Sequence, residues 1–309
     1  MSWNYSAQSN IGEFIQNVSK EEQAPEKKRS FGERMKEQRA AMSDLCSRVF
    51  LEIWGNEQAY KKFLDIWERF TLSPVEGSHG AGVRNAALIY NQCPEAVFLQ
   101  TFAEYGEKNA RIQKDSLAVD IFLPQTVERD GKATTYYNPV KVFDVSQTNA
   151  KIPLPERPVL EELQVIQAIA NTELFAIDIT ENLPDGLDAV YIPNINSAWV
   201  RDGLNAADTT VALLTEFGHY QLSQAKDYIR NPESVFVACS TAYVLAKHYG
   251  LDTKEMNFPA EAFPPLHEAG AIKEILSTVA SVSKKVALKI DKELGAIDLS
   301  QDMDHEVSR

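Results

Sequence analysis

The feature that most constrains the fold is a change of hydrophobic period along the chain. Between residues 31 and 70, apolar residues recur every three or four positions, which is typical of amphipathic helices. Residues 118–123 and 140–145 are instead continuous β-prone runs, and helical spacing returns after three prolines within 149–158. A chain with both periods is neither all-α nor all-β. We therefore predict an α+β fold with a domain boundary at residues 149–158.

Four segments follow from this division. Residues 1–30 are polar and are expected to form a flexible arm, whereas residues 296–309 are expected to form an acidic tail. Residues 31–150 should hold a helical extension followed by a small α+β domain, and 151–295 a mostly helical domain with a small β-sheet. Predicted helices lie at 83–91, 95–105, 159–171, 206–226, 233–249 and 267–294, with a break near Gly55 and Asn56 and a hairpin over 189–201.

Charge is unevenly distributed between the two halves. Residues 1–150 contain 18 basic and 20 acidic residues, and residues 151–309 contain 13 and 24. The first half is thus nearly neutral and can carry a local nucleic-acid groove. The second half should repel nucleic acid and favour a basic protein partner.

The cysteines and the hydropathy of the chain indicate the cellular compartment in which it works. The three cysteines, Cys46, Cys93 and Cys239, are far apart and form no CxxC pair. This sparse set suits a reducing compartment and argues against a structural zinc knuckle. No run of 18 apolar residues occurs, and the first 19 residues lack the apolar core of a secretory signal. We predict a cytoplasmic protein with no membrane partner; its oligomeric state is left open.

One helical segment carries a motif with chemical meaning, the stretch from Thr215 through Glu216 to His219. In HExxH enzymes, two histidines four residues apart on one face of a helix coordinate zinc, and the glutamate between them activates water. Here the glutamate and second histidine are present, but Thr215 stands at the first histidine position. A lone ExxH is common by chance, so the alternative is an ordinary glutamate beside a neutral histidine in a packed helix.

Several further blocks resemble the ArdC/LtrC-type antirestriction proteins, over about residues 84–294. The resemblance rests on the run from Asn85 to Pro94, the VFDxSQT-like residues 142–148, Ala242-Tyr243-Val244, residues 250–253, and Phe258-Pro259. It implies an N-terminal domain that binds single-stranded DNA, joined to a zincin-like metallopeptidase domain.

The chain departs from that family at both implied sites. The family's first zinc histidine falls on Thr215, and its glutamate ligand falls on Cys239. A basic turn falls on residues 113–116, and a family tryptophan falls on Tyr105. Catalytic zinc needs three protein ligands, and only His219 and Cys239 suit it. We therefore expect no resident cofactor, although zinc stays open if Glu233 or His248 supplies a third ligand; otherwise Cys239 is a buried small residue.

Single-strand binding requires cationic side chains beside aromatic faces on which bases stack. The candidates are the cations Arg84, Arg111, Lys114 and Lys141 and the aromatics Tyr105, Tyr136 and Tyr137. Their alternative roles are a solvated surface for the charges and core packing for the rings. Because the first half has no basic excess, any affinity should depend on salt.

Taken together, these features predict a non-catalytic antirestriction or accessory protein of a mobile element or phage, which binds single-stranded DNA or a protein. One alternative is a zinc metallopeptidase in which Glu216 is the general base and His219 and Cys239 are ligands. Another is an acidic protein-interaction module that inhibits a nucleic-acid enzyme by imitating DNA.

Overall fold

The computed structural model describes residues 30–129, 132–152 and 159–307, and their side chains as far as residue 295, apart from those of Arg129 and Lys132. The described residues form helices and two small sheets, so the predicted α+β class is confirmed. The predicted arm at 1–30 lies outside the described residues except for Ser30, as does most of the predicted domain boundary, at 153–158. The division into domains therefore stays a prediction.

The first half begins with two helices that meet at the predicted break. Helix α2 (Phe31–Ile53) starts at Ser30, whose hydroxyl accepts the Glu33 amide in a capping box. Helix α3 (Glu57–Trp67) starts at the capping residue Asn56, directly after Gly55 with a φ of 78°. A π-helical turn (Glu68–Leu72) and helix α4 (Val83–Gln92) follow.

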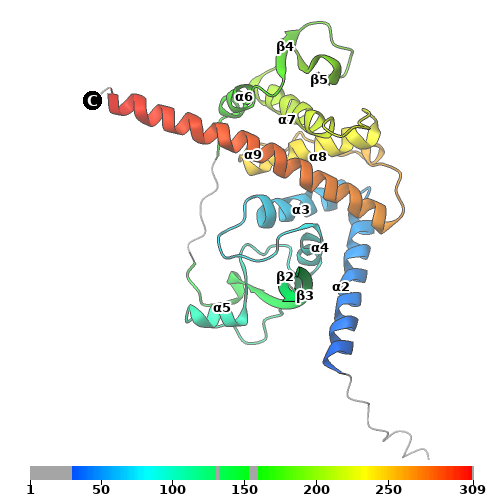
Figure 1. The fold of residues 1–309 in the computed structure, drawn as a ribbon, viewed down its shortest axis with the longest axis vertical. Coiled ribbons are helices and arrows are strands. Elements are labelled where there is room, and N and C mark those ends of the chain that lie inside the picture. The colour runs from blue at the N-terminus through cyan, green and yellow to red at the C-terminus, as the bar shows by residue number, and fades with distance from the viewer. Residues whose placement is uncertain (1–29, 130–131, 153–158, 308–309) are drawn as a thin grey trace, which may run out of the picture.

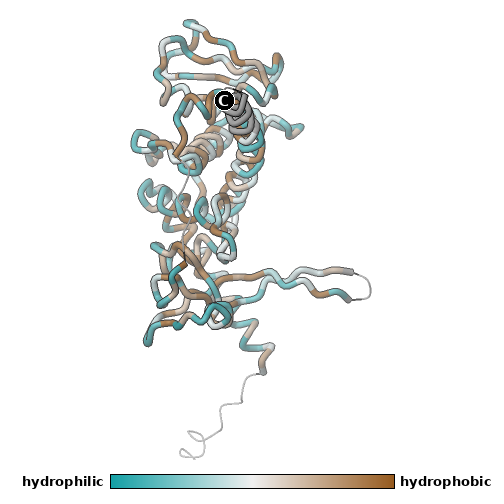
Figure 2. The backbone as a smooth tube through the Cα atoms, turned by 90° about the vertical axis from the view of Figure 1, so that its left-hand side faces the viewer, coloured by the Kyte–Doolittle hydropathy of each residue, from teal (hydrophilic) through white to brown (hydrophobic). Residues whose placement is uncertain are grey.

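The first sheet has the strand order β1-β3-β2 and is antiparallel. Strands β2 (Val119–Arg129) and β3 (Lys132–Asp144) form a long hairpin that projects from the body of the molecule (Figure 2). The helix predicted at 95–105 is wrong: the segment forms β1 (Leu99–Thr101) and then α5 (Phe102–Glu107). The carboxylate of Asp144 accepts the amides of Val97 and Phe98, which holds this segment at the sheet edge.

The second half opens with helix α6 (Glu162–Asn171) and a second small sheet. Strands β5 (Ala189–Ile192) and β6 (Ser197–Arg201) form the predicted hairpin, with Asn196 in the left-handed region. Strand β4 (Ala176–Thr180) pairs in parallel with β6 and was not predicted, although Ile177 and Ile179 alternate with Asp178 and Thr180 over this short segment. The sheet order β4-β6-β5 leaves β5 at one edge.

Three helices complete the second half: α7 (Ala206–Leu222), α8 (Pro232–His248) and α9 (Ala269–Val307). Helix α9 crosses the molecule and packs on elements of both halves (Figure 1). It continues past residue 295, where an acidic tail was expected to begin, because 296–307 contain no proline and only ordinary helix formers.

The two halves share one hydrophobic core. The rings of Trp54 and Tyr60 from the first half pack edge-on against Phe263 of the second, with centroids 5.4 and 5.2 Å apart. The buried Tyr60 hydroxyl lies 2.8 Å from the Ser240 hydroxyl, and the Trp54 indole donates to the Pro264 carbonyl at 2.9 Å. In the part of the chain that the structure describes, no helix is long and apolar enough to cross a membrane.

Candidate functional site

Helices α7 and α8 lie close together where the motif residues are placed. Gly218 permits this approach, since a Cβ at that position would lie 3.1 Å from the Ala238 Cα. The contact places Glu216 of α7 and Cys239 of α8 on one cleft of about 400 Å³, which Thr215 also lines. His219 is fully buried and does not line the cleft. The structure therefore brings three of the four predicted site residues to one cavity.

Arg230, which was not predicted as a site residue, pairs with Glu216 in this cleft. The Arg230 guanidinium donates two hydrogen bonds to the Glu216 carboxylate, at 2.8 Å to Oε2 and 2.9 Å to Oε1. Glu216 also accepts the backbone amide of Tyr191 at 2.6 Å, from edge strand β5. The Glu216 side chain is only 3% exposed, so an unpaired charge there would be costly. The only sequence signal for Arg230 is its place in the loop between the helices that carry Glu216 and Cys239.

His219 occupies an apolar and electropositive environment. One ring nitrogen, Nδ1, lies 2.8 Å from the Tyr228 hydroxyl, whereas Nε2 is buried and has no hydrogen-bond partner. Burial, with the Arg230 charge as a smaller cause, lowers the pKa of His219 to about 3. The ring is therefore neutral at physiological pH.

The other predicted ligands do not complete a metal site. Burial, followed by the nearby Glu216 charge, raises the pKa of the Cys239 thiol, so it stays protonated rather than forming the thiolate that zinc prefers. The Thr215 hydroxyl donates to the Val211 carbonyl at 2.9 Å. Glu233 lies in the first turn of α8, and His248 lies at the far end of that helix.

A metal therefore does not fit the donors of this cleft. Among the described residues, no group of three or more His, Cys, Asp or Glu side chains could hold an ion. The motif carboxylate, Glu216, is already paired with a fixed cation, and a divalent ion beside it would be repelled by that guanidinium. Arg230 supplies the positive charge that a metal would otherwise bring to Glu216.

The residues predicted to bind nucleic acid are only partly brought together. Arg84 and Tyr137 line a second cavity of about 510 Å³. Tyr136 neighbours Tyr137 on β3 and so points to the opposite face. Lys141 pairs with Asp120 at 3.2 Å, and Arg111 and Lys114 are exposed in the loop before β2.

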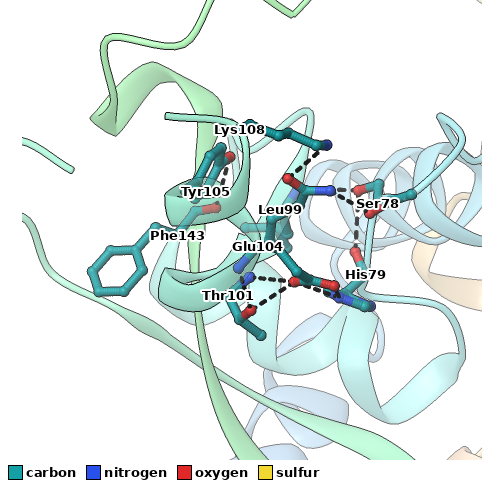
Figure 3. A network of polar contacts seen from close by, with 10 residues as sticks. Ser78, His79, Leu99, Thr101, Glu104, Tyr105, Lys108 and Phe143 are labelled. Carbon is teal, nitrogen blue, oxygen red and sulfur yellow. Dashed lines mark hydrogen bonds and ion pairs between the residues drawn. The ribbon is translucent and has the colours of Figure 1, made fainter. Parts of the chain in front are cut away.

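The ring of Tyr105 is part of the core and is not exposed. It is fully buried, and its hydroxyl donates to the carbonyls of Phe98 and Phe143 (Figure 3). Beside it, Nε2 of His79 lies 2.8 and 2.9 Å from the two carboxylate oxygens of Glu104, and one of these, Oε2, also accepts the amide and hydroxyl of Thr101. This polar network fastens the loop that holds His79 to the edge of the first sheet, and it offers no face on which a base can stack.

Comparison with known proteins gives a likeness of fold. The chain is similar to the crystal structure of the antirestriction protein ArdC from plasmid R388 in its Mn(II)-bound form, with a TM-score of 0.50 and 16% identity over 68% of this chain and 84% of that one. The metal-free form of the same protein aligns with a TM-score of 0.49 and 17% identity, over 69% of this chain and 85% of that one. No protein-family model matches the chain.

A curated relative is an uncharacterized protein of Bacillus anthracis, 26% identical over 233 residues. The match spans 57% of this chain but only 39% of the relative. The chain thus corresponds to about two fifths of that longer protein, and the relative's name assigns no activity.

Proposed function

We propose that this chain is a non-catalytic antirestriction accessory protein of a mobile element, which acts by binding and not by cleaving peptides. The observation that carries the non-catalytic part is the two-bond pairing of Arg230 with Glu216. The fold that the chain shares with Mn(II)-bound ArdC supports the antirestriction class.

The pairing bears directly on catalysis. A general base must present a free lone pair to the proton that it abstracts. Three of the about four lone-pair sites of the Glu216 carboxylate are occupied, two by Arg230 and one by the Tyr191 amide. The guanidinium holds this carboxylate in a salt bridge, and the neutral His219 lies outside the cleft lining, which supports a role other than the activation of water. The metallopeptidase alternative would require Arg230 to move away, which would leave the buried carboxylate with the Tyr191 amide alone among these partners.

One observation favours the acidic-module alternative as a second candidate. The same cleft is lined by Asp188, Asp208 and Glu255 in addition to Glu216, with Arg230 as its one cation among the lining residues. A basic peptide segment would complement this surface. On this alternative, the cleft binds a basic protein, and binding weakens as salt rises.

The proposed function is tested with a charge-free version of the pair. The double variant Glu216→Gln/Arg230→Met removes the carboxylate and the guanidinium together, so no buried charge is left alone. Its protection of an unmodified plasmid that enters a restricting host is compared with that of the wild type. We expect equal protection once thermal melts show both proteins to be folded. Loss of protection in a folded double variant would contradict a non-catalytic function.

A further inference from the structure

The hairpin of β2 and β3 projects from the body of the molecule (Figure 2). Within the described residues, only 142–144 of β3 pair with a further strand, which is β1. Residues 124–126 and 133–137 are exposed. A two-stranded hairpin without a third strand or a helix against it is only marginally stable in water. The projecting residues therefore lack the cover that a sheet of this length normally has.

Hydrogen bonds to α4 show which backbone groups of the hairpin face outward. The Asn85 side chain donates to the carbonyl of Phe122 at 2.9 Å and accepts its amide at 2.8 Å, so these two groups point away from β3. Gln92 binds the carbonyl and amide of Asp120 in the same way. Because outward and inward positions alternate along a strand, Thr126 also faces outward.

The register carries this alternation across to β3. Phe122 lies opposite Pro139, and Thr126 lies opposite Thr135, with their hydroxyls 3.0 Å apart. Residues that lie opposite each other in such pairs turn their amides and carbonyls away from each other, and Pro139 has no amide to leave unpaired there. Beyond it, the outward positions of β3 are 137, 135 and 133. We call residues 133–137 the β3 edge.

The projecting part of the hairpin also lacks charge. Residues 121–127 and 133–140 contain no Asp, Glu, Lys, Arg or His, although 24% of the whole chain is charged. Free strand edges are usually protected by charged side chains or by proline. On β3 the only proline is Pro139, opposite the part of β2 that α4 holds. The β3 edge is thus open to pairing with another strand.

We propose that the β3 edge pairs with the β3 edge of a second copy of the chain, antiparallel, with Thr135 at the two-fold axis. Thr135 then faces Thr135 of the second copy, and Ala133 faces Tyr137. Each facing pair exchanges two hydrogen bonds, which gives about six between the two chains. The two hairpins become one four-stranded antiparallel sheet, and the interface is the same surface on both copies.

The side chains of the β3 edge are self-complementary in this register. Tyr137 lies beside Ala133 of the second copy on one face of the sheet, and Tyr136 lies beside Thr134 on the other. The two rings are 56% and 47% exposed in the single chain. Each ring gains a small or β-branched neighbour, and an aromatic ring beside a β-branched residue is a favourable cross-strand pair. No like charges meet across the axis.

The charge of the chain favours a second copy over a charged partner at this edge. Each chain carries a net charge of −13, so two copies repel each other at most approaches. The uncharged hairpin is the place where this repulsion is least. A nucleic acid or an acidic protein would require cations, and a basic protein would require carboxylates; the β3 edge offers neither. Because the paired segment is short, the dimer should be weak.

The test is analytical ultracentrifugation of the full chain from about 1 to 200 µM. Thr135→Pro removes the outward amide at the centre of the β3 edge. Thr126→Pro makes the same change at the opposite residue, on the free edge of β2, and loses the same contact between the two threonines. Proline is tolerated at outward positions of edge strands, and the hairpin already has it at 124 and 139.

We expect the mass of the wild type to rise from that of one chain toward that of two over this range, and Thr126→Pro to behave alike. Thr135→Pro should weaken the dimer by about tenfold or more, because it removes the two central hydrogen bonds. The dimer should strengthen as salt rises, since screening reduces the repulsion between two acidic chains. Circular dichroism melts establish that both variants are folded.

A pair of cysteine variants tests the same axis without proline. Thr135→Cys places two thiols on residues whose Cα atoms lie about 5.5 Å apart, which is within the range of a disulfide. Mild oxidation should therefore link two chains of Thr135→Cys. It should not link Thr126→Cys or the wild type, whose own cysteines are buried or half-buried.

A wild type that stays monomeric at the highest concentration would overturn the proposal. Equal effects of the two proline variants would also overturn it, as would equal cross-linking of the two cysteine variants or a dimer that weakens as salt rises. None of these results touches the non-catalytic claim, which depends on Arg230 and Glu216.

Discussion

The Arg230 guanidinium and the Glu216 carboxylate form two parallel hydrogen bonds, of 2.8 and 2.9 Å, between the α7–α8 loop and helix α7. This geometry is the strongest form of the arginine–carboxylate pair. It holds both oxygens of Glu216 against the α7–α8 loop.

The pair should behave as one unit in a double-mutant cycle. Glu216→Gln alone leaves Arg230 without its partner and should lower the free energy of unfolding by about 3 kcal/mol. Arg230→Met alone should cost a similar amount, because it leaves Glu216 buried and charged. The double variant should cost clearly less than the sum of the two, as measured by urea denaturation. Simple additivity would contradict the pairing.

A second ion cluster, around the partly buried His248, makes stability depend on pH. His248 lies 3.6 Å from Asp291, and 3.8 Å from Glu68 of the π-helical turn in the first half. Burial opposes protonation, but hydrogen bonds and charge from Asp291 and Glu68 outweigh it and raise the pKa of His248 to about 9.

Because this pKa is higher in the fold than in the unfolded chain, the stabilisation is complete below about pH 6.5 and is lost as pH rises through 9. Between pH 7 and 9 the free energy of unfolding should fall by about 2 kcal/mol. His248→Gln should abolish this fall, whereas His267→Gln, at an exposed position, should leave it unchanged. A flat wild-type profile over this range would rule out the cluster as a source of stability.

The close contact between α7 and α8 depends on the absence of a side chain at Gly218. An added methyl group would meet both the Cα and the Cβ of Ala238, at 3.1 and 3.3 Å. Gly218→Ala should therefore lower the free energy of unfolding by about 1 kcal/mol or more, despite the better helix propensity of alanine. Gly295→Ala, in an open part of α9, should raise it slightly. Stabilisation by both changes in calorimetry would mean that the helices can separate without cost.

The shared core predicts that both halves unfold together. Tyr60→Ala should lower the melting temperature of the whole chain, with a cost of about 3 kcal/mol or more, since the ring is fully buried between Phe236, Phe258 and Phe263. Circular dichroism and tryptophan fluorescence should report one coincident transition. Two separated transitions would instead support independent domains.

Much of the fold could be predicted because local signals agreed with it. The break at Gly55, the hairpin around Asn196 and the three long helices of the second half were all marked by turn residues or by period. The segment at 95–105 was predicted incorrectly because its conformation is fixed by Asp144, more than 40 residues away. Strand β4 was not predicted although Ile177 and Ile179 alternate with polar residues, because the strand has only five residues and its place in the sheet depends on pairing with β6, about 20 residues away.

The site was predicted less completely for the same reason. Glu216, Thr215 and Cys239 were placed near one another by motif spacing and resemblance, and they do line one cleft. Arg230 belongs to no motif and becomes significant only through the fold.

The central claim is that Arg230 provides the cation of this cleft and that no metal is held there. Its most direct test is the metal content of the purified chain, measured by inductively coupled plasma mass spectrometry after dialysis against zinc and, separately, against manganese. We expect far less than one ion per chain, with no change in His219→Ala. One zinc or manganese ion per chain that is lost in His219→Ala would contradict it.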